Sequence, residues 1–235
     1  MSKCTALELK YPNNTLYASV IQGDDEVILV DCGYPNSLDK LDEALKTLNL
    51  SLDQITRLII THHDYDHMGS AAELKRRFPK IKVCSSSIQR DFINGSKKSL
   101  RLLQAESIFP TLQDNQKEQA LIFHKTLEAM ETLDLDEVLV EGTDYPWAGG
   151  THIVASPGHM PGHISVYHKP TQSLITGDAM VVENGKLCIA NPRYTLDNEQ
   201  AYASMKKFND YPLEKIICYH GGLVSENIKD QLNAL

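Results

Sequence analysis

The chain of 235 residues is long enough to bury one hydrophobic core, and its content of 42% hydrophobic and 23% charged residues is that of an ordinary globular protein. A net charge of −8 argues against a nucleic-acid partner, because phosphate binding requires clustered Lys and Arg. No stretch approaches the roughly 20 apolar residues that span a bilayer, so we expect no membrane partner.

The cysteines and the first residues bear on the cellular location. The five cysteines are odd in number and form no CxxC pair, which favours reduced thiols over a disulfide framework. The N-terminal residues lack the long apolar run of a signal peptide. We therefore expect a cytoplasmic protein. We also expect its substrate to be a small molecule.

Strand and helix patterns alternate in the first third of the chain. Short apolar runs bounded by turn residues predict strands, over 16–22, 26–31, 57–61 and 81–84. Leucines at helical spacing predict a helix over 37–49, with Asn36 or Ser37 as its N-cap. A second helix is predicted over 69–78, where Pro79 ends it.

From about residue 85 to residue 136 the pattern becomes helical. Ala120, Phe123, Leu127 and Met130 fall on one face of a helix within 117–133, so we predict a helical insert packed on an α/β core. Strand and helix patterns then return, with strands over 137–140, 151–156, 162–168, 173–176 and 215–219, and helices over 198–208 and from 225 on. Because no repeat or linker interrupts the pattern, we expect a single domain over 1–235.

The most informative segment is 61–67, Thr-His-His-Asp-Tyr-Asp-His, which follows a predicted strand. Its last six residues include three His and two Asp, whose lone pairs suit a divalent metal. A polar surface loop could have this composition by chance. However, so much charge beside a buried strand costs desolvation, and a bound metal is the simplest compensation.

Three further predicted strands are followed by a possible ligand. These are His159 in Ser-Pro-Gly-His, Asp178 in Thr-Gly-Asp, and His220 in Tyr-His-Gly-Gly. In an α/β sheet, strand ends on one edge converge on one crevice. Each of these residues alone is a weak signal, since a lone His is more often structural. Their order and setting together indicate one metal site.

The order of these motifs resembles that of the metallo-β-lactamase superfamily, whose pattern is HxHxDH, then a His, a bridging Asp and a final His. The resemblance runs from Val-Asp-Cys-Gly at 30–33 to His-Gly at 220–221. It implies a four-layer αββα sandwich, in which Asp31 orients the site without binding metal. It also implies one metal on His62 and His159, a second on Asp66, His67 and His220, and Asp178 bridging the two.

Asp64 is the departure from that pattern, because it stands where the family has its second His. Asp64 could bind the first metal through oxygen, which would make it the seventh ligand. Two divalent ions are then expected; zinc is the first candidate, and the added carboxylate favours manganese or iron more than an all-imidazole site would. The alternatives are that His63 replaces the missing ligand, or that no residue does and the first site is weak.

The remaining histidines are expected to play other roles. His63 would either orient the site or face solvent, and His163 would support the site or the fold. His124, His152 and His168 are expected to have no metal role, because the ligand set is complete without them.

The resemblance implies a hydrolase in which two divalent ions share a hydroxide that attacks an acyl carbon, while Asp66 also passes a proton to the leaving group. The apolar residues of the insert mainly bury it on the core. These residues include Phe92, Leu121 and Phe123, and a minority of the apolar set could line a pocket. Such a pocket favours an ester, a lactone or a thioester over a phosphodiester.

Three related families limit this prediction. Only 15 residues follow His220, which leaves no room for the C-terminal domain of glyoxalase II. Acyl-homoserine lactonases carry a Tyr soon after the bridging Asp, where this chain has Ala-Met-Val at 179–181. Tyr194 could substitute, but nothing in the sequence places it at the site. Flavodiiron proteins carry a Glu at the position of Asp64, so a di-iron oxidoreductase without its flavodoxin domain is an alternative function. A metal-binding protein with little turnover is another.

Overall fold

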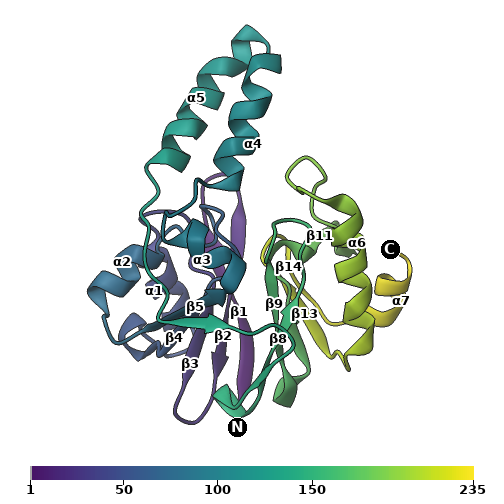
Figure 1. Cartoon of the computed structure of the whole chain (residues 1–235). Coiled ribbons are helices and arrows are strands. Elements are labelled where there is room, and N and C mark those ends of the chain that lie inside the picture. Colours follow the sequence, from purple (N-terminus) through teal and green to yellow (C-terminus); the bar gives the residue numbers. More distant parts are fainter. Residues whose placement is uncertain (1) are drawn as a thin grey trace.

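The computed structural model describes residues 2–235, which form two large sheets with helices on their outer faces (Figure 1). The first sheet consists, in spatial order, of β1 (Lys3–Lys10), β2 (Thr15–Gln22), β3 (Val27–Val30), β4 (Arg57–Ile59), β5 (Lys82–Ser86) and β6 (Glu137–Leu139). The first three strands pair antiparallel, and β4, β5 and β6 are each added parallel to the strand before.

The second sheet is built from the C-terminal half of the chain. It consists, in spatial order, of β14 (Gly222–Val224), β13 (Lys215–Cys218), β10 (Ser173–Ile175), β9 (Ile164–His168), β8 (Thr151–Ala155) and β7 (Asp144–Tyr145). Only β10 and β13 pair in parallel within it. A separate hairpin is formed by β11 (Val181–Glu183) and β12 (Lys186–Cys188).

Seven α-helices complete the fold of residues 2–235: α1 (Leu38–Lys46), α2 (Ala71–Arg77), α3 (Ser87–Ile93), α4 (Leu100–Ile108), α5 (Asp114–Glu128), α6 (Asn198–Lys206) and α7 (Ile228–Asn233). Within this range, no helix combines the length and the apolar character that crossing a bilayer demands. All five cysteines are free, as predicted.

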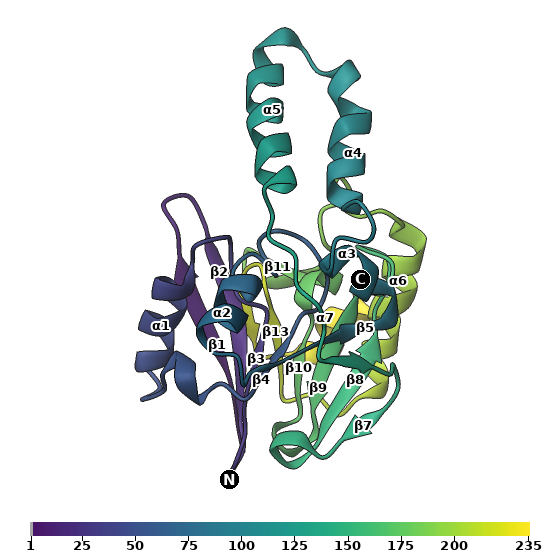
Figure 2. The same ribbon diagram turned by 60° about the vertical axis from the view of Figure 1, so that its left-hand side comes forward.

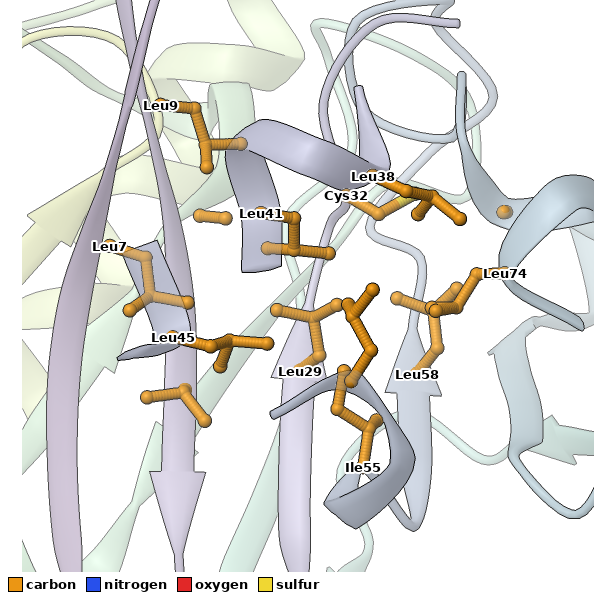
Figure 3. Close-up of a cluster of buried hydrophobic side chains, with 14 of the residues drawn as sticks. Leu7, Leu9, Leu29, Cys32, Leu38, Leu41, Leu45, Ile55, Leu58 and Leu74 are labelled. Atoms are coloured by element: carbon orange, nitrogen blue, oxygen red, sulfur yellow. The ribbon is translucent and has the colours of Figure 1, made fainter. Parts of the chain in front are cut away.

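Three hydrophobic clusters fill the spaces between four layers. The first lies between the first sheet and the helices α1 and α2, and contains Leu29 of β3 and Leu41 of α1 (Figure 3). The second lies between the two sheets and contains Ile28 of β3 and Ile153 of β8. The third lies between the second sheet and α6 and α7, around Phe208. Neighbouring residues of a strand point to opposite faces, so β3 serves two clusters at once. The four-layer αββα sandwich is therefore confirmed.

The predicted helical insert contains α3, α4 and α5. Figures 1 and 2 show that α4 and α5 form a hairpin that projects from the sandwich. The expected packing on the core holds at the base, where Ile93 and Leu127 are buried. It does not hold farther out, because Leu121 and Ile122 are 48% and 52% exposed. Leu121 therefore does not bury the insert on the core, and it is not among the lining residues of the two cavities beside the hairpin, which corrects that part of the prediction.

Candidate metal centre

Loops that follow four strands bring the predicted ligands together. The strands are β4 of the first sheet and β8, β10 and β13 of the second. Because both sheets contribute, the site lies across the edge of the sandwich and not within one sheet. The structure groups all seven predicted ligands there, namely His62, Asp64, Asp66, His67, His159, Asp178 and His220.

The first group consists of His62, Asp64 and His159. Oδ2 of Asp64 lies 3.4 Å from Nε2 of His62 and 3.2 Å from Nε2 of His159. All three side chains are buried. Asp64, rather than His63, therefore lies where the family has its second His.

The second group consists of Asp66, His67 and His220. Oδ2 of Asp66 lies 3.3 Å from Nε2 of His220 and 3.9 Å from Nε2 of His67. Asp178 lies between the two groups: its Oδ1 is 3.2 Å from Nε2 of His67, and its Oδ2 is 3.4 Å from Nε2 of His159. One carboxylate therefore faces both groups, which is the arrangement that a bridging ligand requires.

Buried atoms in the cluster test whether a cation fits. Nε2 of His62, Nε2 of His67 and Oδ1 of Asp178 are buried and have no hydrogen-bond partner. A buried polar atom without a partner is costly, so native structures rarely leave one unexplained. The three residues offer ligand atoms that lie within 4.8 Å of one another. A divalent cation that accepts their lone pairs would satisfy all three, so the residues present fit a metal ion.

The electrostatics of the cluster agree with this fit. Burial lowers the pKa of His62 well below its usual value, so its imidazole is neutral. Burial also acts to lower the pKa of His67 and His220. The nearby carboxylates, of which Asp178 contributes most, outweigh burial. They raise the pKa of His67 well above its usual value and the pKa of His220 to about 10. The histidines in turn hold the pKa of Asp178 well below its usual range, although burial opposes this. Protons on histidines balance the carboxylates, and a bound cation would displace them.

Asp31 orients the cluster from behind. Its carboxylate accepts hydrogen bonds from the backbone N–H and the hydroxyl of Thr61, at 2.9 and 2.8 Å. It also accepts from Nδ1 of His67 at 2.8 Å, which leaves the lone pair of Nε2 directed toward Asp178. This geometry matches the role that the resemblance implied for Asp31.

His163 supports Asp178 through a hydrogen bond to its backbone. Its Nδ1 contacts the hydroxyl of Ser156, and its Nε2 accepts a hydrogen bond from the backbone N–H of Asp178 at 3.0 Å. Gly177 allows this close approach, because it has a φ of +52° and a Cβ there would lie 2.7 Å from Nε2 of His163.

His63 holds the insert and does not face solvent, which removes one of its two expected roles. Its ring is buried, contacts the side chain of Gln89 and stacks on Phe92. Its Nε2 accepts a hydrogen bond from the backbone N–H of Leu100, the first residue of α4. His63 therefore ties the segment next to the metal ligands to the start of the projecting hairpin.

The three histidines outside the predicted site lie elsewhere. His152 pairs with Asp144, His168 contacts the hydroxyl of Thr171, and His124 packs against Phe109. None of the three belongs to a group that could hold a metal in the described chain.

Arg101 is a site residue that the sequence analysis missed. It lies in the first turn of α4, is buried, and forms an ion pair with Asp64 in which Nη2 is 2.5 Å from Oδ2. An arginine in a helical stretch gives no sequence signal for such a role. Only its contacts identify it as part of the site.

A cavity of about 620 Å³, which we call the main cavity of the site, opens over the cluster. Asp66, Asp178 and His220 contribute to its lining, and apolar side chains such as Phe123 and Val181 form part of the wall. Tyr194 also lines it, so the structure places at the cavity the tyrosine whose position the sequence left open. A second cavity of about 460 Å³ lies beside it, along α4 and α5.

Comparison with known proteins agrees with this architecture. The sequence profile of the metallo-β-lactamase superfamily matches residues 15–220. The probable metallo-hydrolase YflN of Bacillus subtilis is 24% identical over 88% of this chain and 80% of its own length. A hydroxyacylglutathione hydrolase of Yersinia pestis is 27% identical over 73% of this chain, but the match spans only 50% of that enzyme. The crystal structure of the metallo-β-lactamase family protein TTHA1429 from Thermus thermophilus shares the fold, with a TM-score of 0.75, 21% identity, and coverage of 98% of this chain and 77% of that one.

Proposed function

Because the chain belongs to the metallo-β-lactamase superfamily, we propose that it is a metal-dependent hydrolase whose substrate is an ester, a lactone or a thioester. The observation that carries this proposal is the set of buried, unpartnered ligand atoms of His62, His67 and Asp178 beneath the main cavity. A cavity with potential metal ligands in its lining suits a reaction in which substrate and metal meet.

The two groups of ligands and the carboxylate between them would hold the metal. Zinc suits the histidines, and the three carboxylates also suit manganese or iron. When bound there, a divalent cation would lower the pKa of a water molecule, to about 7 in the case of zinc, and would polarise a carbonyl oxygen.

Asp66 is the residue of this chain best placed to move a proton. Its carboxylate lines the cavity, and its side chain is 12% exposed, so it can reach a bound substrate. Its backbone carbonyl accepts a hydrogen bond from the hydroxyl of Tyr219, which fixes the loop that carries it. In this proposal Asp66 accepts a proton from the attacking water and passes it to the leaving group.

The charge of the cavity supports an uncharged electrophile over a phosphodiester. Among the described residues that line the main cavity, Arg101 is the only Lys or Arg, and Asp64 already neutralises it. Glu183 adds a further negative charge to the lining. Even where bound cations balance the ligand carboxylates, a phosphodiester would meet Glu183 and no free Lys or Arg among the described lining residues. An acyl compound avoids this repulsion.

The shape of the cavities supports a substrate with an extended arm. The main and second cavities share Arg101, Phe123 and Tyr194 in their linings, so they adjoin. The second cavity is lined mainly by apolar residues and by neutral amides such as Gln116 and Gln119, with Arg193 also in the lining. Such a surface suits a chain that carries both apolar and amide groups. A relative named as a hydroxyacylglutathione hydrolase is consistent with an acyl substrate.

The test is hydrolysis by protein stripped of metal and then reloaded with zinc, manganese or iron. Chromogenic esters, lactones and thioesters serve as substrates. We expect activity to disappear on stripping, to return with metal, and to be lost in Asp178→Asn. His152→Ala removes a histidine outside the cluster and should retain activity. Hydrolysis that survives both complete stripping and Asp178→Asn would contradict the proposal, and oxygen consumption by the iron-loaded protein without hydrolysis would favour the oxidoreductase alternative.

A further inference from the structure

Arg101 places a fixed positive charge inside the candidate metal centre. Its side chain is only 4% exposed. Nε lies 3.2 and 3.1 Å from the two carboxylate oxygens of Asp64, and Nη2 lies 3.1 Å from Nε2 of His159. A guanidinium remains protonated in proteins and can only donate hydrogen bonds. The carboxylate of Asp64 therefore accepts from it, and Nε2 of His159 accepts from it in the tautomer that carries its proton on Nδ1.

The atoms that Arg101 engages are those that the first group would offer to a cation. Oδ2 of Asp64 and Nε2 of His159 belong to that group together with His62. Nε2 of a neutral imidazole has a single lone pair, which cannot be directed to a guanidinium and to a metal at once. A cation at this position would also lie close to a like charge, which disfavours its binding.

The second group carries no such competitor. Among residues 2–235, no Lys or Arg side chain pairs with Asp66, His67 or His220, and Nε2 of His67 has no hydrogen-bond partner. Oδ1 of Asp178, which lies 3.2 Å from Nε2 of His67, likewise has no hydrogen-bond partner. The two halves of the centre therefore differ in the kind of positive charge they contain. The first contains a guanidinium, which keeps its charge, and the second contains two carboxylates and two histidines, which can release a proton when a metal binds.

The guanidinium is held in place from two further directions. Its Nη1 donates to Oε1 of Gln104 at 2.5 Å and to the backbone carbonyl of Tyr194 at 2.9 Å. Gln104 belongs to α4, and its own amide donates to the backbone carbonyl of Arg193 at 3.1 Å. Arg101 thus joins the helical hairpin, the loop around residue 194 and Asp64, and displacing it would break contacts on all three sides.

We infer that the centre is asymmetric: one ion binds tightly at Asp66, His67, His220 and Asp178, while Arg101 weakens binding of a second ion at His62, Asp64 and His159. This inference rests on the metal dependence proposed above. It makes Arg101 a positioning residue of the insert that sets the number of tightly bound ions.

The test is to measure the binding of zinc to metal-free protein. Calorimetric titration gives the affinity for each ion, and equilibrium dialysis gives the number of ions bound. We expect the wild type to retain one ion and to bind a second about tenfold more weakly or worse. Arg101→Met should raise the affinity for the second ion about tenfold or more and leave that for the first ion unchanged. Arg101→Gln removes the charge but retains an amide donor for Asp64, so it provides the same comparison if the methionine variant does not fold.

Arg193→Met is the matched control. It removes the same charge from an exposed arginine that lines the second cavity but makes no contact with the cluster among the described residues. It should bind zinc as the wild type does. Equal affinity for two ions in the wild type, or no change in the Arg101 variants, would overturn the inference and leave metal-dependent hydrolysis intact. Failure of the wild type to bind any ion would instead contradict the proposed function itself.

Discussion

Replacing Asp31 by Asn tests how the fold prepares a ligand. Asp31 is 1% exposed, and its Oδ2 accepts from both the hydroxyl of Thr61 and Nδ1 of His67 at 2.8 Å. As a pure acceptor, the carboxylate keeps a proton on Nδ1 of His67. Asn has nearly the same volume but presents an N–H₂ group on one side. If its oxygen stays with the backbone N–H of Thr61, this group faces Nδ1, and a neutral His67 must carry its proton on Nε2 instead.

The contacts of Asp31 allow estimates of the change in metal affinity and in the free energy of unfolding. Loss of a hydrogen-bond partner behind a metal ligand typically lowers metal affinity about 10- to 100-fold, which corresponds to about 1.4 to 2.7 kcal/mol. In the metal-free Asp31→Asn variant, the hydrogen bond from the backbone N–H of Thr61 is retained, and the other two bonds of Asp31 are replaced by contacts of the new amide. Because Asn has nearly the same volume as Asp, no cavity is created. The free energy of unfolding of the variant should therefore fall by only about 1 to 2 kcal/mol. The effect on metal binding should exceed the effect on the metal-free fold.

Competition with a chromophoric chelator measures the first quantity, and urea unfolding without metal measures the second. Asp144→Asn is the matched control, because Asp144 pairs with Nδ1 of His152 at 2.6 Å outside the cluster. It should leave metal affinity unchanged. The orienting role of Asp31 would be refuted if Asp31→Asn bound metal as tightly as Asp144→Asn does.

Three further predictions concern stability and the insert. Stripping the metal should lower the melting temperature, because the carboxylates of Asp64, Asp66 and Asp178 are crowded and ions that bind only the folded state stabilise it; a melting temperature that chelation does not change would count against the site. Phe208→Ala should lower the free energy of unfolding by about 3 to 5 kcal/mol, since Phe208 is fully buried between the second sheet and α6; a loss below about 1 kcal/mol in urea unfolding would contradict this packing. His63→Ala should retain the bound metal but speed hydrogen exchange at the start of α4, where the bond to the backbone N–H is lost, and loss of an ion with unchanged exchange would show that His63 is a ligand.

Local periodicity predicted most elements of the fold, and tertiary pairing explains those it missed. The strand predicted over 16–22 is β2, and the helix predicted over 37–49 contains α1. β1 was not predicted, because buried and exposed residues alternate clearly only in its last four residues, Leu7–Lys10. β14 begins with Gly222 and has three residues, so its pairing with β13 makes it a strand and its own composition does not.

The candidate ligands could be predicted because their chemistry is distinctive and strand ends converge. Arg101 could not, since its role depends on a contact between α4 and Asp64, which is 37 positions earlier in the chain. That contact requires α4 to start beside the cluster, where His63 accepts the N–H of Leu100. Sequence patterns give helix faces but not the direction in which an insert leaves the core.

Anomalous diffraction from crystals soaked in manganese would test the metal centre most directly, because it locates ions without assuming their ligands. We expect the strongest peak within coordination distance of Asp66, His67, His220 and Asp178, and a weaker peak or none between His62, Asp64 and His159. Peaks at surface carboxylates with none among these seven residues would contradict the metal centre on which the account depends.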